Sequence, residues 1–197
     1  HYVVKQIISS KGTDVTFDIQ NCCVAAGYTL QEKDVPYSGG IDLYSIHFDE
    51  LAGRQEQLHN ELIRDLDFSR RAVPVQAGTY TCVLAPVVAG VFAHESFGHK
   101  SEADFMIGDE VMKREWAIGK QVGAPMLQIL DSGLIEGAGY VPFDDEGNRA
   151  GEQALIRDGL LAGRLHSSYT AAIIGEKPTG NARAVSFEYE PIVRMTT

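Results

Sequence analysis

The segment His94-Glu95-Ser96-Phe97-Gly98-His99 constrains this chain more than any other feature of its sequence. Metalloproteases carry a related pattern, His-Glu-x-x-His, on a helix, where two imidazoles one turn apart bind Zn²⁺ and the glutamate acts as general base. Here the second histidine comes one residue later. On an ideal α-helix, at about 100° per residue, the two imidazoles would point about 140° apart, and one ion could not bind both.

A local distortion of the helix would resolve this conflict. A π-type turn accommodates one extra residue and would return His99 to the side of the helix that His94 occupies. Gly98 makes such a turn cheaper, because it has no Cβ and costs a helix only about 1 kcal/mol relative to alanine. We therefore predict an i to i+5 hydrogen bond or a break between the two histidines, with both imidazoles on one side. The alternative is a regular helix whose histidines share no site.

The residues before the motif predict a helix that starts in the core. Pro86 suits the first turn of a helix, where its missing N–H is not needed, and it follows a β-rich run over residues 79–84 that we expect to form a strand. Four apolar residues then predict a buried helical stripe: Val87, Val88, Val91 and Phe92. The helix would thus lead from the core into a polar cleft at the motif.

The extended pattern His94-Glu95-x-x-Gly98-His99-x-x-Glu102-x-Asp104 resembles the signature of the TldD/PmbA family of zinc metalloproteases, also called modulators of DNA gyrase. Further segments resemble landmarks of that family in the family's order: Phe143–Gly147, Asp158-Gly159, Pro178–Asn181 with Arg183 and Ser186, and Arg194–Thr196. The resemblance covers residues 77–197 well. Residues 1–76 match more loosely, as a β-rich segment followed by a helix.

This resemblance implies a zinc-dependent peptidase that cleaves unstructured peptides. His94 and His99 would hold the metal, and Glu95 would be the catalytic base. Glu102, three residues after His99, could orient an imidazole as an outer partner of the site, with a solvent-facing charge as the alternative. The family's third zinc ligand is a downstream cysteine, and this sequence has no cysteine after Cys82. The chain starts without an initiator methionine and stops just after a strand-like run, so we expect a fragment that lacks N- and C-terminal parts. Without the third ligand we expect it to bind zinc weakly or not at all and to be inactive by itself.

The charge and the cysteine content of the chain restrict the classes of partner and the cellular compartment that we expect. The 27 acidic residues outnumber the 17 basic ones, so we expect no direct binding to nucleic acid. Three cysteines make no disulfide framework, no signal peptide is visible and no apolar run approaches the roughly 20 residues that span a bilayer, which together favour a reducing cytoplasm. The resemblance implies a homodimer or a heterodimer with a family relative. The alternative function is a non-catalytic partner subunit that shapes a peptide channel, and a purely structural domain is a third possibility.

The predicted fold class is α+β, with mixed, largely antiparallel sheets and a long motif-bearing helix packed on the second sheet. Residues 1–76 would be the end of an N-terminal β-rich domain plus a helix, and residues 77–197 the first part of the metalloprotease domain. Apolar and polar residues alternate over residues 14–19, which predicts a half-solvated strand. Further strands are expected over 23–30 and 41–48, separated at residues 31–34 and 37–40, with a helix from Asp49 as its N-cap.

The second half carries clearer local signals. Asp158-Gly159 predicts a tight hairpin, because both residues tolerate positive φ. Residues 167–174 suggest a helix that Gly175 stops. A helix over 109–120, a strand over 125–131 and closing strands over 183–190 and 192–195 are also expected. The acidic run at residues 144–147 lacks the ligand spacing of a Ca²⁺ loop and favours a solvated turn.

Overall fold

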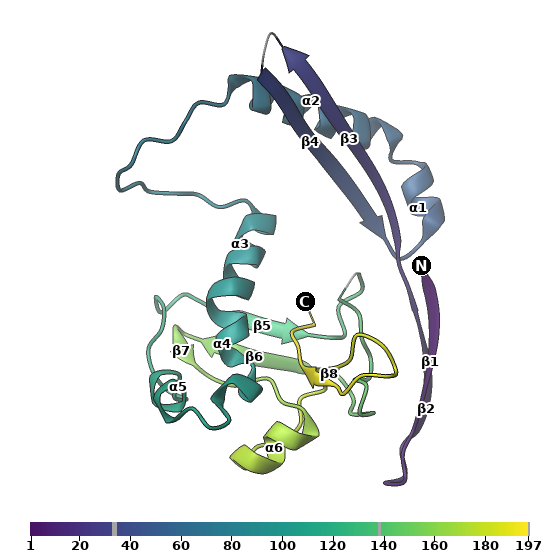
Figure 1. Cartoon of the computed structure of the whole chain (residues 1–197), viewed down its shortest axis with the longest axis vertical. Coiled ribbons are helices and arrows are strands. Elements are labelled where there is room, and N and C mark those ends of the chain that lie inside the picture. Colours follow the sequence, from purple (N-terminus) through teal and green to yellow (C-terminus); the bar gives the residue numbers. More distant parts are fainter. Residues whose placement is uncertain (33–34, 138, 197) are drawn as a thin grey trace. The chain divides into compact units, whose positions relative to one another are not determined.

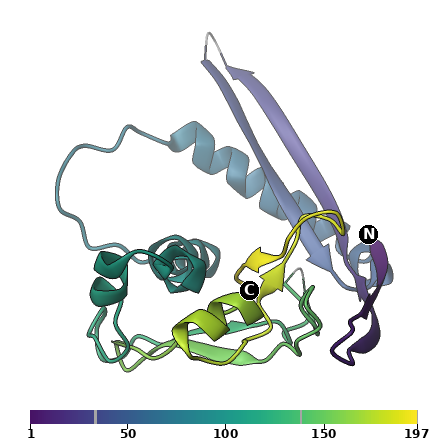
Figure 2. The ribbon, with the colours of Figure 1, turned by 60° about the horizontal axis from the view of Figure 1, so that its bottom comes forward.

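The computed structural model of the chain describes residues 1–32, 35–137 and 139–196. Helices and antiparallel strand pairs make up the structure, which confirms the predicted α+β class (Figures 1 and 2). The chain forms two compact units, one from His1–Val3 with Gln20–Cys82 and the other from Val4–Ile19 with Val83–Thr197. The division into domains after residue 76 stays a prediction.

In the first unit a long hairpin packs against a helix. The strands pair antiparallel in one continuous register, and the helix runs along them (Figure 1). Its elements are β3 (Cys22–Glu32), β4 (Val35–Ser45), α1 (Phe48–Ala52) and α2 (Gln55–Arg71). The helix predicted with Asp49 as its N-cap thus starts two residues earlier, with His47 as the N-cap, and is interrupted at Gly53 and Arg54 before α2 begins.

Residues 37–40 were predicted to separate two strands, and that prediction is wrong because they belong to β4. Gly39 pairs with Tyr28, whose hydroxyl donates to the Asp65 carboxylate of α2 at 2.9 Å and contacts the Ser69 hydroxyl at 2.9 Å. A Cβ at position 39 would collide with both Tyr28 and Asp65. The glycines therefore serve the close approach of the helix to the hairpin and do not break the strand.

The second unit contains the motif helix and three small strand groups. It has a three-stranded antiparallel sheet in the order β5-β6-β7, the pair β8-β9, and all of the pair β1-β2 except its end at Tyr2, Val3 and Gln20. The strands are β1 (Tyr2–Ile8), β2 (Asp14–Gln20), β5 (Ile129–Ser132), β6 (Glu152–Arg157), β7 (Leu160–Leu161), β8 (Ala182–Arg183) and β9 (Ile192–Val193). The helices are α3 (Pro86–Ala93), a π-turn (His94–Gly98), α4 (His99–Ser101), a 3₁₀ turn (Ala103–Met106), α5 (Glu110–Glu115) and α6 (Ser168–Ile174).

The turn at Asp158-Gly159 and the helix that Gly175 ends, both predicted from short sequence patterns, are confirmed. Asp158 and Gly159 have φ of 52° and 75° in the turn between β6 and β7. Ser167 caps α6 by accepting the N–H of Thr170, and Gly175 ends the helix with φ of 83°. Polar and half-buried residues alternate along β2 as predicted. The closing strands are shorter than expected, since residues 184–190 lie in a loop between β8 and β9.

Helix α3 departs from the sequence prediction. Val87, Val88, Val91 and Phe92 are between 52% and 79% exposed, so the predicted buried stripe is wrong. The run before it, residues 79–84, forms no strand, because no other described segment pairs with it. The spacing of apolar residues shows which face of a helix is suited to burial, but burial also needs another part of the protein to pack against that face. In α3 only the C-terminal end packs against other residues of the unit.

The acidic run at residues 144–147 is not a solvated turn, which corrects the prediction. Asp144 is fully buried, and its carboxylate accepts the backbone N–H groups of Glu146, Asn148 and Ala182. Burial raises the pKa of Asp144, while these hydrogen bonds oppose the rise. Asp144 therefore anchors the loop to β8 through a buried carboxylate, while Asp145, Glu146 and Gly147 are half-buried. Among the described residues, no helix has both the length and the apolar character needed to span a bilayer.

Candidate metal centre

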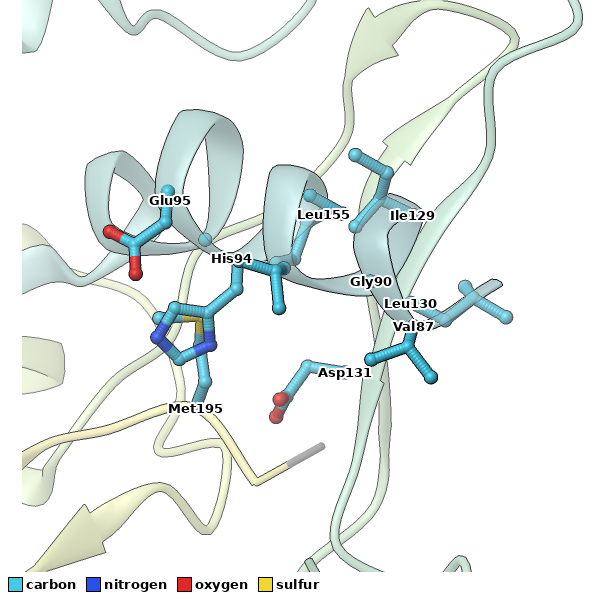
Figure 3. A pocket seen from close by; sticks show the side chains of 12 residues that line it. Val87, Gly90, His94, Glu95, Ile129, Leu130, Asp131, Leu155 and Met195 are labelled. Atoms are coloured by element: carbon cyan, nitrogen blue, oxygen red, sulfur yellow. The ribbon is translucent and has the colours of Figure 1, made fainter. Parts of the chain in front are cut away.

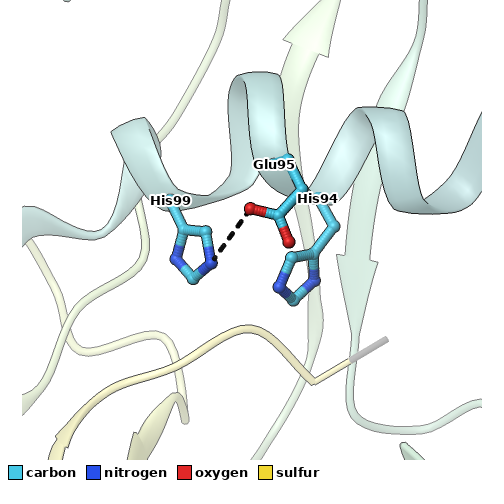
Figure 4. Close-up of side chains that lie close together, drawn as sticks. All are labelled: His94, Glu95 and His99. Carbon is cyan, nitrogen blue, oxygen red and sulfur yellow. Dashed lines mark ion pairs between the residues drawn. The ribbon is translucent and has the colours of Figure 1, made fainter.

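A π-turn joins α3 to α4 at the motif. The N–H of His99 donates to the C=O of His94, which is the predicted i to i+5 hydrogen bond. The two imidazoles lie on the same side of the helix, with ring centroids 4.7 Å apart and planes at 86° (Figure 4). The prediction of a distorted helix with convergent imidazoles is therefore confirmed.

The turn brings three side chains of metal-binding type together. One ligand atom each of His94, Glu95 and His99 can be chosen so that all lie within 4.8 Å of one another. The Glu95 carboxylate stands 3.9 Å from Nε2 of His99 and is largely exposed to solvent (Figure 4). Two imidazoles and a carboxylate suit Zn²⁺, whereas Ca²⁺ and Mg²⁺ favour all-oxygen sites. The donors on this face therefore fit the metal that the motif implies.

Glu102 lies behind His99 and is buried. Its Oε2 is 3.2 Å from Nδ1 of His99, and the residue is only 1% exposed, which excludes a solvent-facing charge. Burial raises the pKa of Glu102, and the contact with His99 lowers it. If Nδ1 carries the proton and donates it to Glu102, Nε2 keeps its lone pair on the side that faces Glu95. Glu102 is thus placed to fix the ring and tautomer of His99.

The other carboxyl oxygen of Glu102, Oε1, is buried and accepts no hydrogen bond from any residue that the structure describes. A buried carboxyl oxygen without a partner is costly. The free-energy cost of this unpaired oxygen is consistent with a polar site whose geometry the rest of the fold holds in place.

Two arginines lie near the metal centre. Arg183 and Arg194 line the same 570 Å³ cavity as Glu102, His94 and His99.

Contacts of Met195 and Asp131 that the sequence did not predict support the turn. Met195 packs against Gly98 so closely that a Cβ on that glycine would overlap its sulfur. The neighbouring Thr196 is held by Asp131, whose Oδ1 accepts the Thr196 N–H at 2.7 Å. Asp131 Oδ2 accepts the Thr196 hydroxyl and the Asn181 amide, each at 2.8 Å. No local pattern could reveal these contacts, because they join segments 50 and 65 residues apart.

We expect Gly98→Ala to destabilise the chain and to disturb the metal centre. The added methyl group would push Met195 from its place under the π-turn, and overpacking of this kind costs about 1–3 kcal/mol. Urea denaturation monitored by circular dichroism measures the loss of unfolding free energy. Gly53→Ala is the control, since a Cβ there meets no described atom within 4 Å. Equal stability of the two variants would contradict the supporting role of Met195.

Comparison with known proteins gives consistent matches. Residues 77–197 match the family model described as PmbA/TldA metallopeptidase C-terminal domain. A metalloprotease of Synechocystis sp. is 49% identical over 62% of this chain and 27% of its own length. A metalloprotease of Methanocaldococcus jannaschii is 34% identical over 95% of this chain and 41% of its own. A zinc metalloprotease TldD homolog of Saccharolobus solfataricus is 34% identical over 79% of this chain and 33% of its own.

Solved structures share the fold. A Thermotoga maritima protein, named as a proposed modulator of a DNA gyrase, matches with a TM-score of 0.72 and 22% identity over 92% of this chain and 41% of its own. TldE of Thermococcus kodakarensis matches with a TM-score of 0.70 and 16% identity over 95% of this chain and 42% of its own. The chain thus spans between about a quarter and two fifths of the length of the relatives named here.

Proposed function

The chain belongs to the PmbA/TldD metallopeptidase family, and from that membership we propose that it carries the metal-binding and catalytic residues of a zinc peptidase that cleaves unstructured peptides. One observation carries the proposal: the π-turn places His94, Glu95 and His99 on one face, with their ligand atoms within 4.8 Å. The names of the relatives, metalloprotease and zinc metalloprotease, agree with it.

Each residue of the centre then has a distinct role. His94 and His99 would hold the metal as neutral imidazoles, and Glu102 would keep the His99 ring in place through Nδ1. Bound zinc would supply Lewis acidity, which polarises a peptide carbonyl and makes water more acidic. Glu95 would accept a proton from the attacking water and pass it to the leaving amine. Its exposed carboxylate is free to approach both groups.

The third protein ligand is part of the proposal. Zinc sites normally take at least three protein ligands, and this centre offers two imidazoles plus a glutamate that the reaction needs as its base. Because the chain spans only part of the length of its relatives, we propose that it belongs to a longer protein, called here the whole protein, which adds a ligand. Glu102 is the candidate within the chain, but its contact with His99 already engages one oxygen.

Metal analysis of two samples tests this function. The whole protein should hold about one zinc per chain and hydrolyse an unstructured fluorogenic peptide, with activity lost to a chelator and restored by zinc. The 197-residue chain alone should lose its zinc on dialysis against a mild chelator and should show no hydrolysis. Zinc that survives this dialysis at one ion per chain would show that a third ligand lies within the chain. A whole protein that neither binds zinc nor hydrolyses peptides would contradict the peptidase function.

The alternative, a non-catalytic subunit that shapes a peptide channel, is weakened by the convergent His-Glu-His donors. We propose that the whole protein pairs with itself or with a family relative, and the fold match to TldE is consistent with either arrangement. Light scattering of the whole protein, alone and with its relative, measures this. The cytoplasmic location and the lack of direct nucleic-acid binding stay predictions.

A further inference from the structure

An apolar pocket of about 480 Å³ opens beside the candidate metal centre (Figure 3). This volume lies within the range of pockets that hold small ligands. Helix α3, strands β5 and β6 and the C-terminal segment line it, chiefly through Val87, Gly90, Val91, Ile129, Leu155 and Met195. His94 and Glu95 lie at one end, Val87 and Leu130 lie toward the other, and the Asp131 side chain lies between them (Figure 3).

The charge of Asp131 does not make this pocket a site for cations. Asp131 is 3% exposed. Its Oδ1 accepts from the Thr196 backbone, and its Oδ2 accepts from the Thr196 hydroxyl and the Asn181 amide. Both oxygens are therefore engaged by the protein, and a lysine or arginine side chain would have to displace these bonds. Apart from His94 and Glu95 at one end, the wall that remains is apolar.

We propose that this pocket is a specificity subsite that takes an apolar side chain, aliphatic or aromatic, of the peptide residue next to the cleaved bond. The inference rests on the peptidase function proposed above and names a substrate preference for the same site. The pocket is continuous with His94 and Glu95, so a residue seated in it would have its backbone at the reacting groups. The exposed Val87 and Val91 of α3 would be covered by the substrate, which accounts for apolar residues on an open face.

Gly90 offers a direct test of this assignment. It lies on the pocket wall, and a Cβ there meets no described atom within 4 Å. In Gly90→Leu the new side chain starts from this open position on the pocket wall and takes up space in the pocket, and leucine favours a helix more than glycine does. Val88→Leu is the matched control, because Val88 lies on the same helix and is not among the pocket-lining residues.

The measurement compares peptides that differ only at one residue beside the cleaved bond: leucine, phenylalanine, alanine or lysine. The wild-type whole protein should have the highest kcat/KM for leucine and phenylalanine. In Gly90→Leu this preference over alanine should fall at least about tenfold, because one methylene in an apolar pocket changes discrimination by about 10–200-fold. Val88→Leu should keep the wild-type order.

Peptide binding is measured separately from cleavage, so that evidence against the subsite can be distinguished from evidence against the peptidase function. The Kd of each peptide for Glu95→Gln, with and without Gly90→Leu, is obtained by fluorescence anisotropy. Cleavage with no apolar preference, or with one that Gly90→Leu leaves unchanged, would overturn the subsite and leave the peptidase function intact. No cleavage, but binding that ranks leucine and phenylalanine first and loses that ranking in Gly90→Leu, would support the subsite and contradict the function.

Two further results would overturn the assignment. A preference for lysine would show that Asp131 acts as a counter-ion in spite of its hydrogen bonds. Loss of the oligomeric state in Gly90→Leu, with Val88→Leu unaffected, would show that another subunit fills the pocket. Light scattering of each purified variant provides this readout.

Discussion

Glu95→Gln in the whole protein is expected to keep its zinc and to lose peptidase turnover by at least about a hundredfold. General-base assistance contributes roughly 10²–10⁴ to a rate, and glutamine keeps the shape of the side chain while it cannot accept the proton. Glu95 is well placed for this role, since its carboxylate is exposed and stands 3.9 Å from Nε2 of His99. Steady-state hydrolysis of a fluorogenic peptide, with zinc content measured on the same sample, gives both quantities.

Glu110→Gln is the matched control for that experiment. Glu110 is an exposed glutamate on α5, where it pairs with Lys113, and it does not line the metal centre. Its replacement removes the same charge and should leave turnover unchanged. If Glu95→Gln instead kept full activity, another group would have to be the base, and Glu102 would be the next residue to replace.

His94→Ala is expected to weaken zinc binding to the whole protein by more than about a hundredfold, and Glu102→Gln by about 10–100-fold. The second figure is the usual effect of removing a group that orients a metal-bound imidazole, and loss of a ligand itself must exceed it. The buried contact of Glu102 with Nδ1 of His99 is the basis for this ranking. Competition with a chromophoric chelator measures the dissociation constants.

The control for the histidine variant is His59→Ala. His59 is an exposed histidine on α2, in the other compact unit, so its loss should leave zinc affinity unchanged. Unaltered affinity in His94→Ala would contradict the proposed ligand set. Unaltered zinc affinity in Glu102→Gln alone would agree with the proposed ligands and contradict the orienting role of Glu102.

Local geometry is what the sequence predicted well. The extra residue between His94 and His99 required a π-turn for convergence, and that turn is present. Asp158-Gly159 and Gly175 needed positive φ, and each adopts it. In these cases the responsible interactions lie within a few residues, so the residue types and their spacing contain the information.

Contacts across the chain could not be predicted in this way. Gly39 belongs to a strand because it pairs with Tyr28 of β3, and Tyr28 and Asp65, neither a sequence neighbour, leave no room for a Cβ there. Asp144 is buried where the backbone N–H of Ala182, 38 residues further along the chain, donates to its carboxylate. The apolar face of α3 depends on a covering surface that its own spacing cannot supply. The roles of Asp131 and Met195 at the metal centre belong to the same group.

The network at Asp131 also sets the order in which the centre can assemble. The imidazoles come from one turn of chain, a local structure that forms quickly. Their support at Met195 and Thr196 requires Asp131 to meet residues 50 and 65 positions away, and contacts of such separation form late because long loops must close first. In a partly synthesised chain the two histidines therefore lack the contacts of Met195, Thr196 and Asp131 that support the π-turn. We infer that the chain binds metal tightly only after these contacts have formed.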